Sequence, residues 1–143
     1  MKSKTIEMEP MTRSVEAVRY SVDEEKRTVE MSFSSEEPVQ RLFGIEILDH
    51  NTSSVDLTRL NNSAPLLVNH NWDDQVGVVE KARIGEDKKG RAVVRFGNSE
   101  RAKEIFQDVR DGIRRLVSVG YNVTRMQREG MSDGVETYRI TSW

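Results

Sequence analysis

The chain has 143 residues, 36% of them hydrophobic and 32% charged, and its net charge at pH 7 is −2. This length fits one domain with its own core, and no apolar run approaches the roughly 18 residues of a membrane span. The near-neutral charge offers no general attraction to nucleic acid, and the absence of cysteine excludes disulfides, thiolate zinc sites and a cysteine nucleophile.

The first half of the chain is predicted to be mostly β-strand. Residues 1–13 are polar and irregular, which predicts a flexible leader before a domain over residues 14–143. They carry no apolar stretch of the kind found in secretory signals. Apolar and polar residues alternate over residues 14–21 and 28–34, on either side of a polar turn, and this pattern predicts an antiparallel hairpin. A third strand is expected over residues 43–47, followed by a loop rich in Asn, Ser and Thr.

The second half is predicted to add five strands and one helix. A capping Ser99 or Asn98, a first-turn Glu100 and a terminating Gly112 bound the helix. Its apolar stripe is Ala102, Ile105, Phe106, Val109 and Ile113. The strands are expected over residues 65–70, 76–84, 91–96, 116–123 and 137–143. The predicted fold is therefore mainly β, an antiparallel, barrel-like domain with one packed amphipathic helix.

Two apolar stretches contain residues suited to catalysis. His70 ends the stretch 66–71, and Ser118 lies inside the stretch 116–121. Serine is a poor nucleophile unless a base takes its proton, and histidine suits that task best. The chain has only one other histidine, His50. On residue types alone, structural roles for both stretches are the commoner ones, and no G-x-S-x-G motif is present.

The remaining candidates have weaker patterns. His50 and His70, with their neighbouring aspartates, lack the spacing of a zinc site, so no metal and no cofactor are predicted. Arg114 and Arg115 precede the Ser118 stretch, where they would either help to stabilise an oxyanion or complement the end of the helix. Trp72 and Trp143 are predicted to be packing residues.

The order of these segments resembles the prohead maturation proteases of tailed bacteriophages, a family related in fold to the herpesvirus assemblins. The matching pieces are residues 43–50, residues 65–71, Gly77, residues 89–94, the helix ending at Gly112, and residues 116–121. The resemblance covers about residues 14–142 through the order of the elements and not through one stringent motif. It implies that His70 is the general base and Ser118 the nucleophile.

The resemblance also implies a function. It predicts a serine endopeptidase that cleaves scaffold and major capsid proteins inside the assembling prohead of a phage or prophage, in the host bacterial cytoplasm. Family members continue beyond the strand that matches residues 137–143, so this chain is expected to be truncated at Trp143 and poorly active. The third catalytic member is then either a carboxylate beyond Trp143, which we favour, or His50.

Two other classes of function remain open from the sequence. One is a non-catalytic β domain that binds capsid or scaffold protein, and the other is an unrelated barrel with an apolar ligand cavity. An unpaired strand at Trp143 would also permit self-association, whereas no membrane or nucleic-acid partner is expected. The distance between the side chains of Ser118 and His70 separates the protease from these alternatives.

Overall fold

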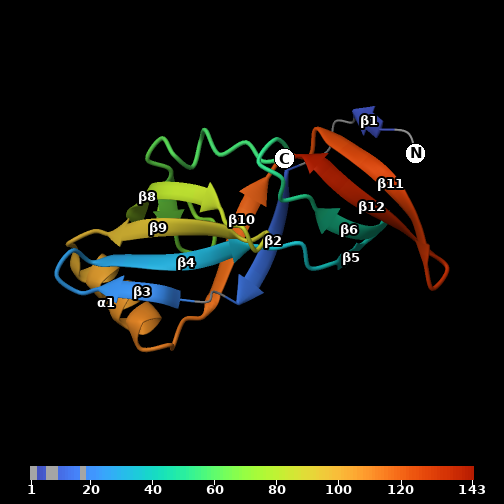
Figure 1. Ribbon diagram of the computed structural model, residues 1–143. Coiled ribbons are helices and arrows are strands. Elements are labelled where there is room, and N and C mark those ends of the chain that lie inside the picture. Colours follow the sequence, from blue (N-terminus) through green and yellow to red (C-terminus); the bar gives the residue numbers. More distant parts are fainter. Residues whose placement is uncertain (1–2, 6–9, 17–18) are drawn as a thin grey trace.

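The computed structural model describes residues 3–5, 10–16 and 19–143, which form three β-sheets and one helix. One sheet lies next to helix α1 (Glu100–Arg110), a second lies at the other end of the molecule, and a two-stranded ribbon runs between them (Figure 1). The position of this ribbon matters because it carries Ser118.

The sheet next to the helix is antiparallel throughout. Its strands, in spatial order, are β3 (Arg19–Asp23), β4 (Thr28–Ser34), β9 (Gly90–Phe96), β8 (Gln75–Ile84) and β7 (Pro65–Leu67). Alternating apolar residues of β4, β8 and β9 pack with the buried face of α1 to form the first core. The predicted hairpin of β8 and β9 is confirmed, and β3 pairs with β4 as expected.

The second sheet combines antiparallel pairs with one parallel pair. Its strands, in order, are β1 (Ser3–Thr5), β11 (Arg125–Ser132), β12 (Val135–Ser142), β6 (Gly44–Leu48) and β5 (Val39–Arg41). Strands β12 and β6 run parallel, with Ile140 opposite Leu48. Both of these residues are fully buried in the second core, together with Trp143.

Strands β2 (Met11–Glu16) and β10 (Leu116–Tyr121) form the ribbon, with Ser14 opposite Ser118. Side chains alternate between the two faces of a strand, so Val119 and Tyr121 point to the face opposite that of Ser118. Val119 packs against both cores and Tyr121 belongs to the second. The ribbon therefore joins the two sheets through its buried face.

Helix α1 begins and ends where the sequence predicts. Ser99 caps it by accepting a hydrogen bond from the Ala102 N–H at 3.1 Å, and Gly112, with φ of 77°, follows its C-terminus. The stripe is buried at Ala102, Ile105 and Phe106. Ile113 was wrongly placed in this stripe: it lies beyond the left-handed glycine and is 73% exposed, because the chain has already left the helix axis.

The predicted mainly β class with one packed helix is confirmed, but the strands of the described residues form separate sheets and no closed barrel. Within residues 1–13, where the sequence predicts a flexible leader, residues 3–5 form β1 and residues 11–13 belong to β2. The division into a leader and a domain stays a prediction. Strand β2 pairs with β10 and not with β4, so only the second part of the expected first strand, in β3, joins the hairpin.

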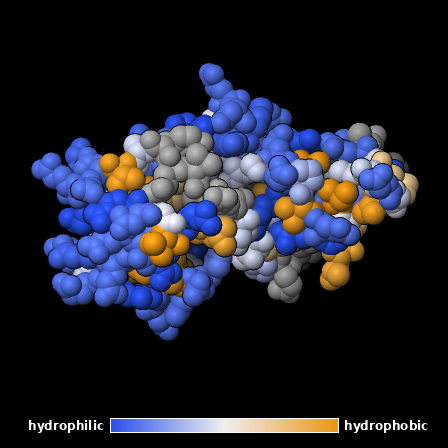
Figure 2. Space-filling model, turned by 90° about the horizontal axis from the view of Figure 1, so that it is seen from below, coloured by the Kyte–Doolittle hydropathy of each residue, from blue (hydrophilic) through white to orange (hydrophobic). Residues whose placement is uncertain are grey.

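Hydrophilic side chains cover most of the face seen in Figure 2, where apolar side chains form small separate patches. Five large hydrophobic residues are exposed in the described part of the chain: Leu42, Trp72, Ile113, Leu116 and Met131. Among the described residues, no helix has the length and apolar character needed to cross a membrane.

Candidate active site

His70 lies on a tight turn that follows the short strand β7. The backbone N–H of Asn71 donates to the carbonyl of Val68 at 3.0 Å, and Asn69 and His70 between them have φ values of 53° and 55°. Two successive left-handed residues inside such a bond are typical of a type I′ turn. The expected strand over residues 65–70 thus stops at Leu67, and the turn presents the imidazole outside the sheet.

Hydrogen bonds close this turn at its base. The Val68 N–H donates to the carbonyl of Asp74 at 3.0 Å, and the carboxylate of Asp74 pairs with Arg101 of helix α1 at 2.9 Å. The hydrogen bond from Arg101 holds the pKa of Asp74 below its usual range, and the charge of Arg114 acts in the same direction. Asp74 was not predicted to hold this turn, although its proximity to His70 in the chain was the available signal.

Ser118 lies on the outward face of β10 and meets the His70 turn there. Its Oγ is 2.8 Å from Nε2 of His70 across 48 residues of chain. The contact predicted from the sequence is confirmed, although the two side chains come from a ribbon strand and a turn and not from neighbouring strands. His70 is exposed and Ser118 half-buried, so this pair is accessible from solvent.

The arrangement has the two elements needed for nucleophilic catalysis. A hydroxyl that donates to Nε2 is placed to lose its proton to the imidazole, which then carries protons on both ring nitrogens. In the described part of the chain no carboxylate is hydrogen-bonded to Nδ1 of His70. The structure therefore brings together a serine–histidine dyad.

His50, the alternative third catalytic member, is not hydrogen-bonded to this dyad, because both of its ring nitrogens are bonded elsewhere. Nδ1 donates to the Leu48 carbonyl and Nε2 accepts from the hydroxyl of Ser34, each at 2.8 Å. The ring is fully buried and contacts Trp143, with ring centroids 5.1 Å apart. Burial lowers the pKa of His50, so the neutral ring is favoured.

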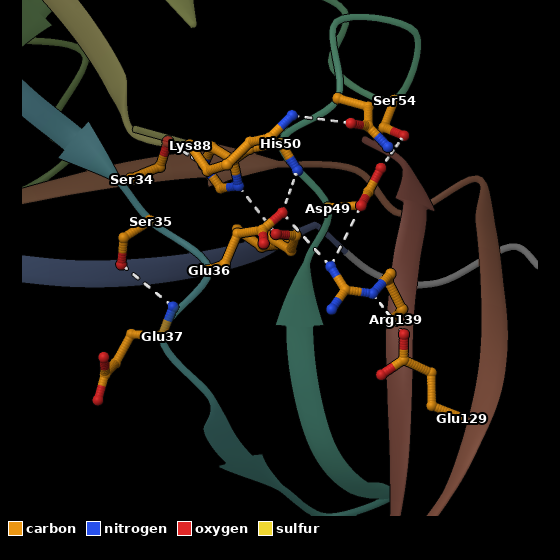
Figure 3. Close-up of polar contacts among 12 residues, drawn as sticks. Ser34, Ser35, Glu36, Glu37, Asp49, His50, Ser54, Lys88, Glu129 and Arg139 are labelled. Atoms are coloured by element: carbon orange, nitrogen blue, oxygen red, sulfur yellow. Dashed lines mark hydrogen bonds and ion pairs between the residues drawn. The ribbon is translucent and has the colours of Figure 1, made fainter. Parts of the chain in front are cut away.

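The surroundings of His50 form a compact polar network (Figure 3). Its backbone N–H donates to Glu36 at 2.7 Å, and Arg139 reaches Glu36, Asp49 and Glu129. Burial raises the pKa of Asp49, but hydrogen bonds from Ser54 and Arg139 outweigh it and leave that pKa below its usual value. This network fixes the segment after β6 against β12, so its role is structural.

The other expectations are met in part. Arg114 and Arg115 are exposed at the entrance to β10, and Arg114 pairs with Asp108 at 3.2 Å, so a part in oxyanion binding stays a prediction. Trp143 is a packing residue as expected, but Trp72 is 65% exposed beside Arg59. No group of three or more metal-ligating side chains occurs among the described residues.

A family model described as caudovirus prohead serine protease matches residues 23–143. The chain belongs to this family. The resemblance found in the sequence is thereby confirmed. The fold relation to the herpesvirus assemblins stays a prediction, since no solved structure matches this chain.

A longer phage protein contains a similar segment. The major capsid protein of Halomonas phage phiHAP-1 is 47% identical over 116 residues, which cover 79% of this chain and 19% of that relative. The chain thus corresponds to a minor part of the length of this relative.

Proposed function

We propose that this chain is the serine endopeptidase domain of a prohead maturation protease, with Ser118 as nucleophile and His70 as general base. The observation that carries the proposal is the 2.8 Å contact between Ser118 Oγ and His70 Nε2 on an exposed surface. Family membership supports a catalytic role for this contact, because a serine hydroxyl paired with an imidazole is the usual means of activating serine for acyl transfer.

The reaction follows from the geometry of the pair. Ser118 Oγ attacks the carbonyl carbon of a peptide bond while His70 Nε2 takes the hydroxyl proton. The imidazolium returns that proton to the leaving amine, and the carbonyl carbon remains esterified to Ser118. Water, deprotonated by the same imidazole, then releases the acid. Backbone N–H groups, helped by Arg114 or Arg115, would stabilise the oxyanion.

The proposed substrates are the proteins of the assembling capsid. The relative named as a major capsid protein contains a segment like this chain within a much longer polypeptide, which supports a close association of protease and capsid sequences. Scaffold segments and the protease itself are the other proposed substrates, and the proposed place of action is the interior of the prohead. We assign no third catalytic residue among those described.

A fluorophosphonate probe tests the catalytic assignment directly. Ser118 Oγ would displace fluoride from phosphorus while His70 takes the proton, so mass spectrometry of tryptic peptides should find the adduct on Ser118. Labelling should vanish in Ser118→Ala and slow by about 100-fold or more in His70→Gln, the scale of general-base catalysis. The matched control is Ser14→Ala, the exposed serine opposite Ser118 on β2, which should keep the wild-type rate.

Cleavage of a co-expressed capsid or scaffold protein, measured by intact mass, completes the test. Loss of cleavage in Ser118→Ala, with retention in Ser14→Ala, would support the proposal. Capsid binding without Ser118-dependent labelling or cleavage would overturn it and favour the non-catalytic binding domain.

A further inference from the structure

A buried cluster of charged residues lies beneath the ribbon that carries Ser118. Its centre is Glu46 on β6, whose side chain is completely buried. Oε1 of Glu46 accepts hydrogen bonds from Nη2 of Arg13 and from the hydroxyl of Tyr121, each at 2.6 Å. Arg41 adds a weaker contact to the same oxygen at 3.3 Å.

This one carboxylate oxygen holds both strands of the ribbon. Arg13 belongs to β2 and Tyr121 to β10, while Glu46 belongs to the second sheet. Arg41 strengthens the same junction, because its Nη2 also donates to the carbonyl of Thr12 at 2.9 Å and to Tyr121 Oη at 3.1 Å. The cluster therefore fastens the ribbon to a sheet with which it shares no backbone ladder.

The cluster and the candidate dyad lie on opposite faces of the same short ribbon. Arg13 stands opposite Val119, so Arg13 and Tyr121 share the buried face. Ser118 is three residues from Tyr121 and lies on the outer face, where it meets His70. His70 comes from a turn of the first sheet, so Ser118 and His70 have no common ladder to fix their separation.

We propose that Glu46, Arg13 and Tyr121 are positioning residues. They fix the distance between Ser118 and His70 by holding the ribbon to the second sheet through its buried face. This inference rests on the proposed function. It adds a site remote from the reacting atoms on which the rate of acyl transfer depends.

The chemistry of the cluster suits such a role. Burial, followed by the hydrogen bond to Glu46, raises the pKa of Tyr121 to about 12, so the hydroxyl keeps its proton and donates. Arg13 Nε and Glu46 Oε2 are buried and have no hydrogen-bond partner among the described residues. Loss of the Tyr121 hydroxyl leaves Oε1 of Glu46 with Arg13 and Arg41 as its only donors in the described part of the chain. A completely buried carboxylate that loses a donor is destabilised, and we expect the strands to shift in response.

The first variant is Tyr121→Phe, which removes one donor and keeps the ring that packs against Trp143. Its matched control is Tyr138→Phe, which also removes a hydroxyl that donates to a carboxylate, that of Glu136 on the same strand β12. Displacement of a catalytic group by about 1 Å costs up to about 100-fold in rate, so we expect Tyr121→Phe to lower kcat by about 10-fold or more with little change in KM. Tyr138→Phe should leave both constants unchanged.

A second variant distinguishes a loss of positioning from a loss of folding. Arg41→Lys acts at the partly exposed edge of the cluster, keeps the charge and loses the forked contacts to Glu46, Tyr121 and Thr12. We expect a smaller fall in kcat and a thermal unfolding transition as cooperative as that of the wild-type chain. A retained kcat in both Tyr121→Phe and Arg41→Lys, in folded protein, would overturn the inference.

An NMR measurement separates this inference from the assignment of function. The cross-peak between the His70 ring protons and the Ser118 β-protons reports their proximity without any turnover. It should weaken in Tyr121→Phe and persist in Tyr138→Phe, even if the wild-type chain cleaves nothing. An unchanged cross-peak in Tyr121→Phe would overturn the positioning role, whereas absent Ser118 labelling in the wild-type chain would overturn the proposed function.

Discussion

At the residue scale, the backbone of Asn69 and His70 explains how the candidate base reaches its partner. Both residues occupy the left-handed region, which few residues other than glycine adopt without cost, although Asn and His are among the more tolerant types. Backbone strain of this kind is common at functional sites. Here it turns the chain away from β7 within two residues, so the imidazole reaches a serine on a different element.

The two histidines differ in burial, and this difference leads to a prediction about pH. Burial lowers the pKa of His50 in the folded chain below its ordinary value of 6.5. The unfolded chain then binds more protons at low pH, so the contribution of the neutral ring to stability is complete above pH 6.5. It should be lost progressively as the pH falls from 6.5 towards the folded pKa.

Urea unfolding at several pH values between 7.5 and 5 would measure this loss. The free energy of unfolding should decline with falling pH in the wild-type chain and decline less in His50→Gln. The comparison variant is His70→Gln, which removes the exposed imidazole and leaves the buried one in place. A decline of the same size in His50→Gln and in the wild-type chain would show that other groups cause the pH dependence.

At the element scale, Phe106 is the one aromatic ring among the three buried residues that helix α1 contributes to the first core. Phe106 is 6% exposed and its ring centroid lies 5.4 Å from that of Phe96 on β9. Truncation of a buried phenylalanine costs about 3–5 kcal/mol through lost burial and a residual cavity. We expect Phe106→Ala to lower the free energy of unfolding by that amount in urea titrations.

Gln107 provides the control for this prediction. It is exposed on the other side of the helix, and Gln107→Ala retains a strong helix former, so the free energy of unfolding should change by less than about 0.5 kcal/mol. Equal effects of the two substitutions on the free energy of unfolding would contradict the packing of the Phe106 face of α1 against the sheet.

The elements that the sequence could predict are those with strong local patterns. The hairpin of β8 and β9 has alternating apolar residues around a glycine-bounded turn, and α1 has a cap, a stripe and a terminating glycine. Strand β11 escaped prediction because residues 125–132 are mostly polar and charged, and its position depends on pairing with β12. The pairing of β2 with β10 joins residues about 100 positions apart, which no local pattern encodes.

The candidate site was predictable in its residue types and not in its geometry. Ser118 and His70 were found from their chemistry and from a family resemblance, and the contact between them followed as an expectation. The sequence left His50 as an alternative because burial, which removes it from the site, depends on tertiary packing. The buried cluster of Arg13, Glu46 and Tyr121 lies on three separate strands, so no spacing in the chain could reveal it.

At the scale of the whole molecule, the ribbon connects the two cores. Val119 packs against both cores, and the buried cluster at Glu46 ties the ribbon to the second sheet. If the two sheets could move independently, the distance between Ser118 and His70 would not be fixed. We therefore expect both sheets to unfold in a single transition.

Native-state hydrogen exchange tests this expectation. The slowest amides of β9 in the first sheet and β12 in the second should give opening free energies that agree within about 1 kcal/mol, because both report global unfolding. Val119→Ala should lower both values by the same amount, about 1 kcal/mol or more for the lost methyl groups. If the amides of β12 opened at a distinctly lower free energy, or responded alone to Val119→Ala, the second sheet would be a separate unfolding unit. Ser118 would then be attached to the less stable unit, and His70 would remain on the more stable one.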